Sequence, residues 1–219
     1  DPFRSRLLSW LGPWRASIAM GRAESRDVPI PDVRFFAARV NFKPRPWLEF
    51  GITRTAQWCG GDRPCDWSTF VDMVMGNDNQ VDPTGPSEQQ PGNQMAGYDM
   101  RLRSPWRALP LVFYTQWIGE DEAGGLPSKF MGQFGLETWC SSRHGGWRIR
   151  AEYSDTACNF SRQTPEFDCA YRNTIYPQGY AYRARNIGAA MDNDGRMFSV
   201  AGMLTRANGD LMSVTIRRT

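Results

Sequence analysis

The amino-acid sequence predicts an all-β chain, an antiparallel transmembrane β-barrel of which residues 1–219 form a single, partial domain. Three observations favour this fold. Apolar and polar residues alternate in about nine segments, the polar positions of these segments carry arginine and carboxylates, and longer and shorter connections follow one another regularly.

Composition excludes several other classes of protein. Lysine and arginine total 26 and aspartate and glutamate 23, a net charge of +3 that is too balanced for a dedicated nucleic-acid binder. His144 is the single histidine, which rules out a multi-histidine metal site, and we expect neither a metal nor a cofactor. Because no stretch approaches the roughly 18 apolar residues of a membrane helix, a membrane protein of this composition would cross with strands.

The strands are predicted from alternation of period two. In segment 47–58 the even positions are apolar except Arg54, and the odd positions are mostly polar. Equally clear alternation is found at 35–43, 147–154 and 211–218, and weaker alternation at 14–22, 93–103, 110–118, 129–139 and 196–206. Most segments have about 8 to 11 residues, which suits a tilted bilayer-spanning strand better than a soluble strand of about 5 to 6 residues.

The polar positions indicate what the polar face encloses. They are occupied mainly by arginines, carboxylates and amides: Arg39, Glu49, Asp99, Arg101, Arg103, Gln116, Gln133, Glu137, Arg148, Arg150 and Glu152. Lysine, common on freely solvated faces, occurs only at Lys43 and Lys129. The fixed fork of arginine suits packed ion-pair networks, as expected of a charged barrel lumen. A compositional preference for arginine is the alternative explanation.

The lengths of the connections give the chain a direction across the membrane. Longer connections fall at 23–33, 58–92, 119–128 and 155–195, and shorter ones at 43–46, 104–109, 140–146 and 206–209. Outer-membrane barrels have short periplasmic turns and longer extracellular loops, whereas a soluble meander has no reason to alternate in this way. The sequence therefore predicts that the longer connections share one end and face the cell exterior.

The five cysteines are placed to stabilise these loops. Cys59 and Cys65 lie in one long connection and Cys158 and Cys169 in another, so each pair can form a disulfide within its own loop. Cys140 lies alone at a short turn. Such bridges suit a protein that passes through an oxidising periplasm, and reduced cysteines of a cytosolic protein are the alternative.

The connection 58–92 contains a short helix signal. Asp66 or Ser68 can cap its start and Gly76 can end it. The apolar face that it would bury comprises Trp67, Phe70, Val71 and Val74. We expect this face to be buried by folding into the barrel mouth.

Three consecutive carboxylates precede a Gly-Gly pair in segment 117–129, the most unusual one in the chain. With Trp117, the acids Glu120, Asp121 and Glu122 could bind sugar hydroxyls or a cation, or supply an acid–base pair for glycoside hydrolysis. Because neighbouring strand residues point to opposite faces, Glu120 and Glu122 would converge while Asp121 turns away. A hydrated loop whose acids bond backbone amides or arginines is the alternative.

The connection 155–195 combines tyrosines with arginines: Tyr171, Tyr176, Tyr180, Tyr182, Arg172, Arg183 and Arg185. Aromatic faces stack on sugar rings and arginine pairs with acidic sugars, although the same rings could simply order a large loop. The candidate polysaccharide-binding residues are Trp117, Glu120, Asp121, Glu122, Tyr176, Tyr180, Tyr182 and Arg183.

Several runs of residues resemble the Wzi family of bacterial outer-membrane capsule assembly proteins. They are 51–58 (GITRTAQW), 93–99 (NQMAGYD), the acidic 119–129, 152–156 (EYSDT) and 175–180 (IYPQGY), and with their strands they cover about residues 34–206. The acidic run that continues into Gly-Gly-Leu-Pro-Ser is the most specific of them.

The resemblance implies a monomeric outer-membrane barrel of about eighteen strands with a helical plug on its periplasmic side. It implies a lectin-like protein without a catalytic step, which binds capsular polysaccharide, contacts outer-membrane lipid and helps attach or organise the capsule at the cell surface. Because a signal peptide, early strands and a plug are not found here, we expect a C-terminal-side fragment. A porin-like channel and a surface glycosidase are the alternative functions.

Overall fold

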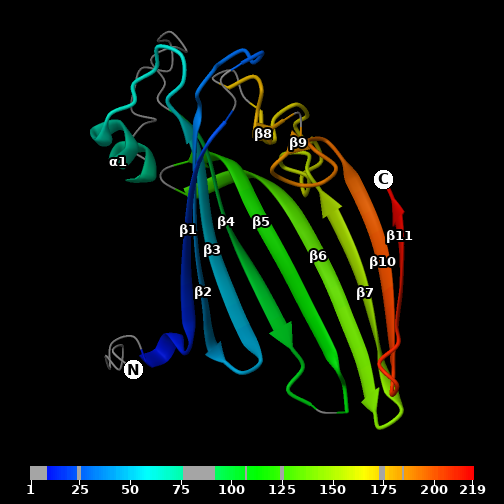
Figure 1. Ribbon diagram of the computed structural model, residues 1–219. Helices are drawn as coiled ribbons and strands as arrows, with labels where there is room; N and C mark the ends of the chain where they lie inside the picture. Colours follow the sequence, from blue (N-terminus) through cyan, green and yellow to red (C-terminus); the bar gives the residue numbers. More distant parts are fainter. Residues whose placement is uncertain are drawn as a thin grey trace.

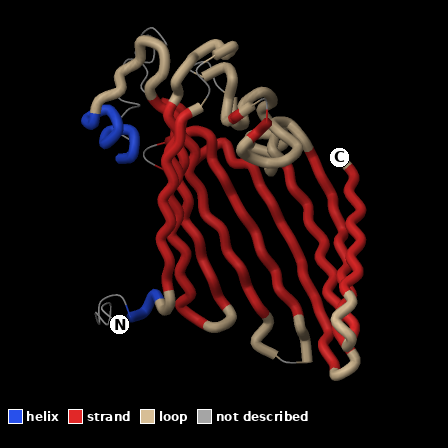
Figure 2. Tube along the Cα trace, in the orientation of Figure 1, coloured by secondary structure: helices blue, strands red, loops and turns tan. Residues whose placement is uncertain are grey.

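Nine long strands form one antiparallel sheet in the computed structural model (Figures 1 and 2). The structure describes residues 9–23, 26–75, 92–106, 108–123, 126–172, 176–183 and 185–219, and of residues 121–123 and 126 only the backbone. The strands follow one another in the sheet in chain order: β1 (Trp14–Arg22), β2 (Arg34–Arg45), β3 (Leu48–Trp58), β4 (Gly92–Arg103), β5 (Leu111–Ala123), β6 (Leu126–Ser142), β7 (Gly145–Asp155), β10 (Arg196–Arg206) and β11 (Leu211–Arg218).

Every strand predicted from alternation is present, and one predicted loop is wrong. Segment 119–128 does not leave the sheet, because β5 and β6 continue their pairing through Gly119 opposite Phe130 and Asp121 opposite Ser128. Glycine allows this close approach, since a Cβ atom at Gly119 would lie 2.5 Å from the carbonyl oxygen of Ser128. The acidic run is therefore part of a long hairpin.

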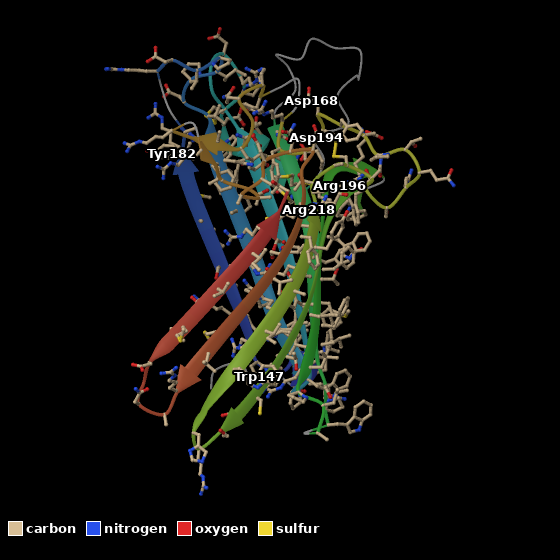
Figure 3. All side chains as sticks on the ribbon, turned by 90° about the vertical axis from the view of Figure 1, so that its right-hand side faces the viewer. Trp147, Asp168, Tyr182, Asp194, Arg196 and Arg218 are labelled. Carbon is tan, nitrogen blue, oxygen red and sulfur yellow. A yellow bond between two sulfur atoms is a disulfide. The ribbon has the colours of Figure 1, made fainter. Side chains whose placement is uncertain are left out.

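The two faces of the sheet differ in chemistry as the alternation predicts. Residues paired in register point to the same face, and one face carries Trp14 opposite Phe42 and then Val40 opposite Ile52. Large apolar side chains are exposed along this face on most strands, among them Ile18, Val40, Ile52, Leu136, Ile149, Val200, Val214 and Ile216. In Figure 3 both edge strands, blue β1 and red β11, lie to one side of the green central strands, so the sheet is curved. We call the apolar, convex side the outer face and the opposite side the inner face.

The inner face carries the network of arginines and carboxylates expected from the sequence. Arg39 forms an ion pair with Asp99 at 2.7 Å, and Arg39 also donates to Thr53 at 2.8 Å. Further along the sheet, ion pairs join Arg101 to Glu137 at 3.4 Å and Arg150 to Glu152 at 3.3 Å. These ion pairs join strands that are separated by one strand, β2 to β4 and β4 to β6, or lie within β7, and they balance charge on this part of the inner face.

The sheet remains open in the described part of the chain, where β1 and β11 are its two edges. An open edge exposes unpaired backbone groups, which cannot be tolerated against lipid. The nine strands therefore have the form of part of a barrel wall.

The long connections gather at one end of the sheet, as predicted (Figure 1). The described parts of 23–33, 59–75 and 156–195 lie at that end, with a two-stranded hairpin formed by β8 (Ala181–Tyr182) and β9 (Arg185–Asn186). The short turns lie at the opposite end, where a 3₁₀ turn, Ser9–Leu11, precedes β1.

The helix predicted in the first long connection is α1 (Trp67–Met75). Asp66 caps it, accepting a hydrogen bond from the Thr69 amide at 2.9 Å and another from the Ser68 hydroxyl. These hydrogen bonds to the charged carboxylate lower the pKa of Asp66 to about 2. None of the described helices is long and apolar enough to cross a membrane.

The predicted buried face of α1 is confirmed at Phe70 and Val74, which pack on the sheet, and is wrong at Trp67 and Val71; the predicted location of the helix is also wrong. The helix buries Phe70 and Met73, whereas Trp67 and Val71 are exposed. It covers the outer face at Phe36 and its neighbours and does not fold into the mouth of the barrel. Apolar residues occupy more than one side of this helix, and periodicity alone does not reveal which side meets the sheet.

Both predicted disulfides are present. Cys59 is bonded to Cys65 and Cys158 to Cys169, while Cys140 is an exposed free thiol. Each bridge closes a loop at the end of the sheet where the long connections lie. The alternative, that all five cysteines are reduced, is not supported.

Thiol labelling is expected to report this pairing directly. The folded, unreduced chain should gain one label, at Cys140, and the denatured and reduced chain should gain five. Intact-mass spectrometry measures both numbers, and five labels before reduction would contradict the two bridges.

Candidate functional site

A hollow of about 660 Å³ opens at the end of the sheet where the long connections lie. One wall is the segment 26–30 of the first connection, and the other comes from the connection between β7 and β10. Its lining includes Arg26, Asp27, Tyr171, Arg172, Gln178, Tyr180, Arg183, Asn186 and Asp192. We call this hollow the loop pocket.

The loop pocket exists because the tyrosine-rich connection is attached to its neighbours. Tyr176 is fully buried, packs with Ile30 and Val33, and donates its hydroxyl hydrogen to the carbonyl oxygen of Cys59 at 2.9 Å. Gln178 donates to the carbonyl oxygen of Ile30 at 2.9 Å, which joins the two walls of the pocket. Three separate connections are therefore held together around this tyrosine.

The floor of the pocket rests on the inner face of the sheet. Tyr180 donates its hydroxyl hydrogen to the carbonyl oxygen of Asn93 at 3.0 Å, and its ring meets Phe35 edge to face at 5.6 Å. Gln57 donates to the carbonyl oxygen of Gly179 at 2.9 Å. The connection thus folds inward over β2, β3 and β4.

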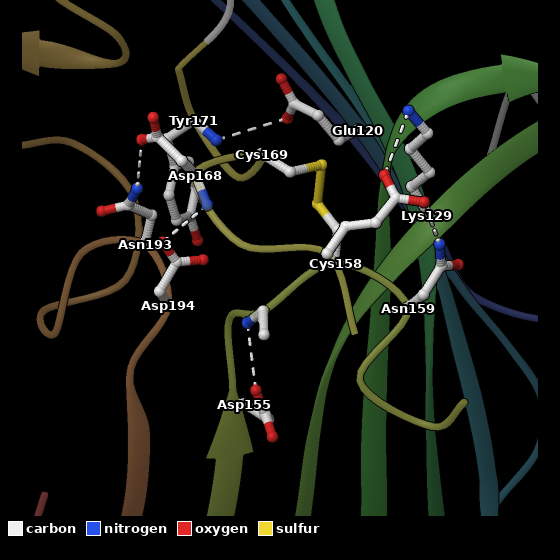
Figure 4. Close-up of a disulfide and its surroundings, with 12 residues drawn as sticks. Glu120, Lys129, Asp155, Cys158, Asn159, Asp168, Cys169, Tyr171, Asn193 and Asp194 are labelled. Atoms are coloured by element: carbon white, nitrogen blue, oxygen red, sulfur yellow. Dashed lines mark hydrogen bonds and ion pairs between the residues drawn. A yellow bond between two sulfur atoms is a disulfide. The ribbon is translucent and has the colours of Figure 1, made fainter. Parts of the chain in front are cut away.

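A disulfide and several carboxylates hold the remainder of the connection (Figure 4). Glu120 accepts from the Tyr171 amide at 3.4 Å, close to the Cys158–Cys169 bridge, and Lys129 pairs with Glu166 at 3.3 Å. Asp194 accepts from the Asp168 amide at 2.7 Å. Glu120 and Asp194 thus accept from backbone amides, which is the alternative that the sequence left open for Glu120.

The pocket offers both charged and neutral hydrogen-bonding groups. Arg172 pairs with Asp192 at 3.4 Å, and Asp192 also accepts from the Asn186 amide group at 2.9 Å. Burial raises the pKa of Tyr171 and of Tyr180, so both phenols stay protonated. The hydroxyl of Tyr180 is used within the protein, where it donates to Asn93, so the amides and the arginine–carboxylate pair are the groups that can bind sugar hydroxyls and carboxylates.

The eight residues predicted from the sequence are divided between different places. Tyr180 and Arg183 line the pocket, and Tyr182 is exposed beside it, with the Arg183 guanidinium 5.4 Å from its ring centre. Tyr176 is buried beneath the pocket wall. The side chains of Asp121 and Glu122 lie outside the described residues.

Trp117 is placed away from the pocket, and Glu120 at the base of its connection. Residue 117 is an outer-face position, where the indole meets Phe134 edge to face at 5.4 Å and Phe160 at 5.4 Å. Glu120 contacts the backbone of the pocket-forming connection instead of lining the pocket. Glu120 and the tyrosine segment are thus neighbours, but Glu120 is not part of the pocket lining.

The sequence analysis did not include segment 26–30, which forms one wall of the loop pocket, among the candidate residues. Its signal was the rule that longer connections share one end, since 23–33 is one of them. Among the described residues, no group of three histidine, cysteine or acidic side chains could hold a metal ion.

Comparison with known proteins gives the fold its context. The sequence profile described as capsule assembly protein Wzi matches residues 1–217. A Klebsiella pneumoniae protein, described as an uncharacterized 55.8 kDa protein in the cps region, is 37% identical over 160 residues, which are 70% of this chain and 30% of that protein.

A solved structure is also similar. It is described as Wzi, an outer membrane protein involved in group 1 capsule assembly in Escherichia coli and a carbohydrate-binding β-barrel. The two are 29% identical, with a TM-score of 0.80 over 98% of this chain and 44% of that chain. This chain therefore spans less than half the length of either relative. The open sheet corresponds to part of a β-barrel, and the match over residues 1–217 shows that the chain belongs to the Wzi family of capsule assembly proteins.

Proposed function

We propose that this chain forms part of an outer-membrane barrel that binds capsular polysaccharide at its extracellular end and assists capsule assembly at the cell surface. The observation that carries the proposal is the loop pocket, where two connections enclose arginine, carboxylate, amide and tyrosine groups. The similar Escherichia coli barrel, described as carbohydrate-binding, supports the same class of ligand. In this proposal the pocket faces the cell exterior and the outer face contacts lipid.

We propose binding without catalysis. A glycosidase needs two carboxyl groups about 5 to 9.5 Å apart on either side of the scissile bond. Glu120 instead accepts a hydrogen bond from the Tyr171 backbone, which gives it a role in positioning the connection. The matching family profile is described as a capsule assembly protein and the similar Escherichia coli barrel as carbohydrate-binding, which agrees with this role.

An open, porin-like channel is less well supported. The connection between β7 and β10 packs Tyr180 against the inner face, where an open pore would need free space. We further propose that the complete barrel is a single monomeric domain, in which this inward-folded connection narrows the extracellular end.

The test is the loss of two arginines from the pocket. In the full-length protein, Arg172→Gln with Arg183→Gln should weaken binding to immobilised acidic capsular polysaccharide by roughly tenfold or more, because charge-assisted hydrogen bonds are lost. Arg162→Gln is the matched control, since Arg162 is an exposed arginine of the same connection outside the pocket lining. Equal affinity of the double variant and the control would refute the pocket as the binding site. Binding should also weaken for the wild-type protein when the carboxyl groups of the polysaccharide are reduced.

A further inference from the structure

The helix α1 lies against the outer face of the sheet. Phe70 of the helix packs on Phe36 of β2, with ring centres 5.4 Å apart, and on Trp58 of β3 at 5.0 Å. Phe36 and Ala56 are paired in register, so both belong to the outer face, and both are buried under the helix. Figure 1 shows α1 beside the upper ends of β1, β2 and β3.

A second apolar stripe of the same helix is exposed, with no cover from the residues that the structure describes. Trp67, Val71 and Met75 are 73%, 40% and 69% exposed, and their spacing of four residues places them along one side of the helix. Ser68 and Asp72, one position further round, are polar and exposed. The helix therefore has two apolar sides, one packed against the sheet and one exposed.

The uncovered stripe continues an apolar surface of the sheet. Met20 of β1 is paired with Phe36, so it lies level with the residue beneath the helix, and it is 62% exposed. Below this level on the same face, Ile52 of β3 is 57% exposed. The helix thus lies at the upper margin of the belt of exposed apolar side chains.

The same helix also supplies a hydrogen-bond acceptor to a charged side chain at this margin. Arg54 is the one basic residue at the outer positions of β3. It donates to the carbonyl oxygen of Met73 at 2.9 Å and to the side chain of Gln94. A cation is favoured near the C-terminal carbonyls of a helix, so α1 supplies the acceptor that a lipid-facing position would lack.

We infer that α1 is an interfacial helix, which lies along the surface of the outer leaflet with Trp67, Val71 and Met75 in contact with lipid. The stripe continues the apolar belt, polar residues lie beside it, and it begins with a tryptophan at the margin of the belt; helices that lie in a membrane interface share these features. The described part of this connection, residues 59–75, would then be attached to the membrane surface through α1. This inference rests on the proposed location of the barrel in the outer membrane.

Spin labels measure the lipid contact directly. The full-length protein with Cys140→Ser is reconstituted in phospholipid vesicles. Three variants each carry one spin label, at Val71→Cys, Asp72→Cys or Ile52→Cys. Oxygen concentrates in lipid and a nickel chelate in water. The ratio of oxygen to nickel accessibility should be several-fold higher at residue 71 than at residue 72, and highest at residue 52. Met75→Cys repeats the measurement if the Val71 variant does not fold.

The three labels show whether the inference about α1, the proposed membrane location, or both are wrong. A water-like ratio at residues 71 and 75 with a lipid-like ratio at residue 52 would overturn the inference and leave the membrane location intact. A water-like ratio at residue 52 as well would overturn the membrane location and the inference together. Spin–spin broadening at residue 71 between labelled copies would assign the stripe to a second copy of the chain, which also overturns the lipid contact.

Discussion

Tyr176→Ala is expected to abolish polysaccharide binding while the barrel stays folded. The side chain is fully buried among Ile30, Val33 and the Cys59 carbonyl, and removing a buried aromatic residue costs about 3–5 kcal/mol. This substitution weakens the contacts between the connections and leaves the sheet intact, because the strands keep their backbone pairing. The loop pocket should therefore open, and segments 23–33 and 156–195 should become sensitive to protease.

Two variants separate positioning from contact with the ligand. Tyr176→Phe removes only the hydrogen bond to Cys59, so it should cost about 1 kcal/mol and retain most of the binding. Tyr182→Ala removes an exposed ring, so any loss of binding should occur without new protease sites. Binding to immobilised polysaccharide, limited proteolysis and the heat-dependent gel mobility of the barrel give the three readouts. A Tyr176→Ala protein with normal binding would contradict the positioning role.

The sheet could be predicted from the sequence because each strand has one side toward lipid and the other toward the aqueous lumen. An outer residue such as Ile52 and an inner residue such as Thr53 must differ in polarity, and the alternation follows directly. The hairpin of β5 and β6 is longer than the prediction, because alternation placed the strands only at 110–118 and 129–139. Backbone pairing at Asp121 and Gly119 does not depend on that alternation.

The site was predicted less completely than the sheet, because its contacts join distant segments. Tyr176 and Tyr180 were recognised as aromatic residues of a loop, but the sequence could not tell a buried support from a ligand-facing ring. Their partners, Cys59 and Asn93, are separated from them by 117 and 87 residues. Local patterns also could not place α1 on the outer face of the sheet, since apolar residues lie on two sides of this helix.

Glu152→Ala is expected to destabilise the sheet itself more than any other single change on the inner face. The carboxylate of β7 accepts from the hydroxyl of Tyr114 on β5 at 2.7 Å and from the amide of Gln133 on β6 at 3.1 Å. It also accepts from Ser199 on β10 at 3.4 Å and pairs with Arg150. One side chain thus links four strands, and its removal leaves several half-buried donors without an acceptor.

The expected loss is about 3 kcal/mol in the free energy of unfolding, because water in the lumen replaces only part of these hydrogen bonds. Urea-induced unfolding of the full-length protein in vesicles measures it. Glu49→Ala is the matched control: Glu49 faces the same side, forms no hydrogen bond or ion pair with the described residues, and should cost less than about 0.5 kcal/mol. Glu152→Gln should fall between the two, since an amide oxygen still accepts from Tyr114 but no longer carries charge toward Arg150. Equal stability of the Glu152→Ala and Glu49→Ala proteins would show that the strands are held by backbone pairing alone, and that the charged inner face serves the lumen and not the stability of the wall.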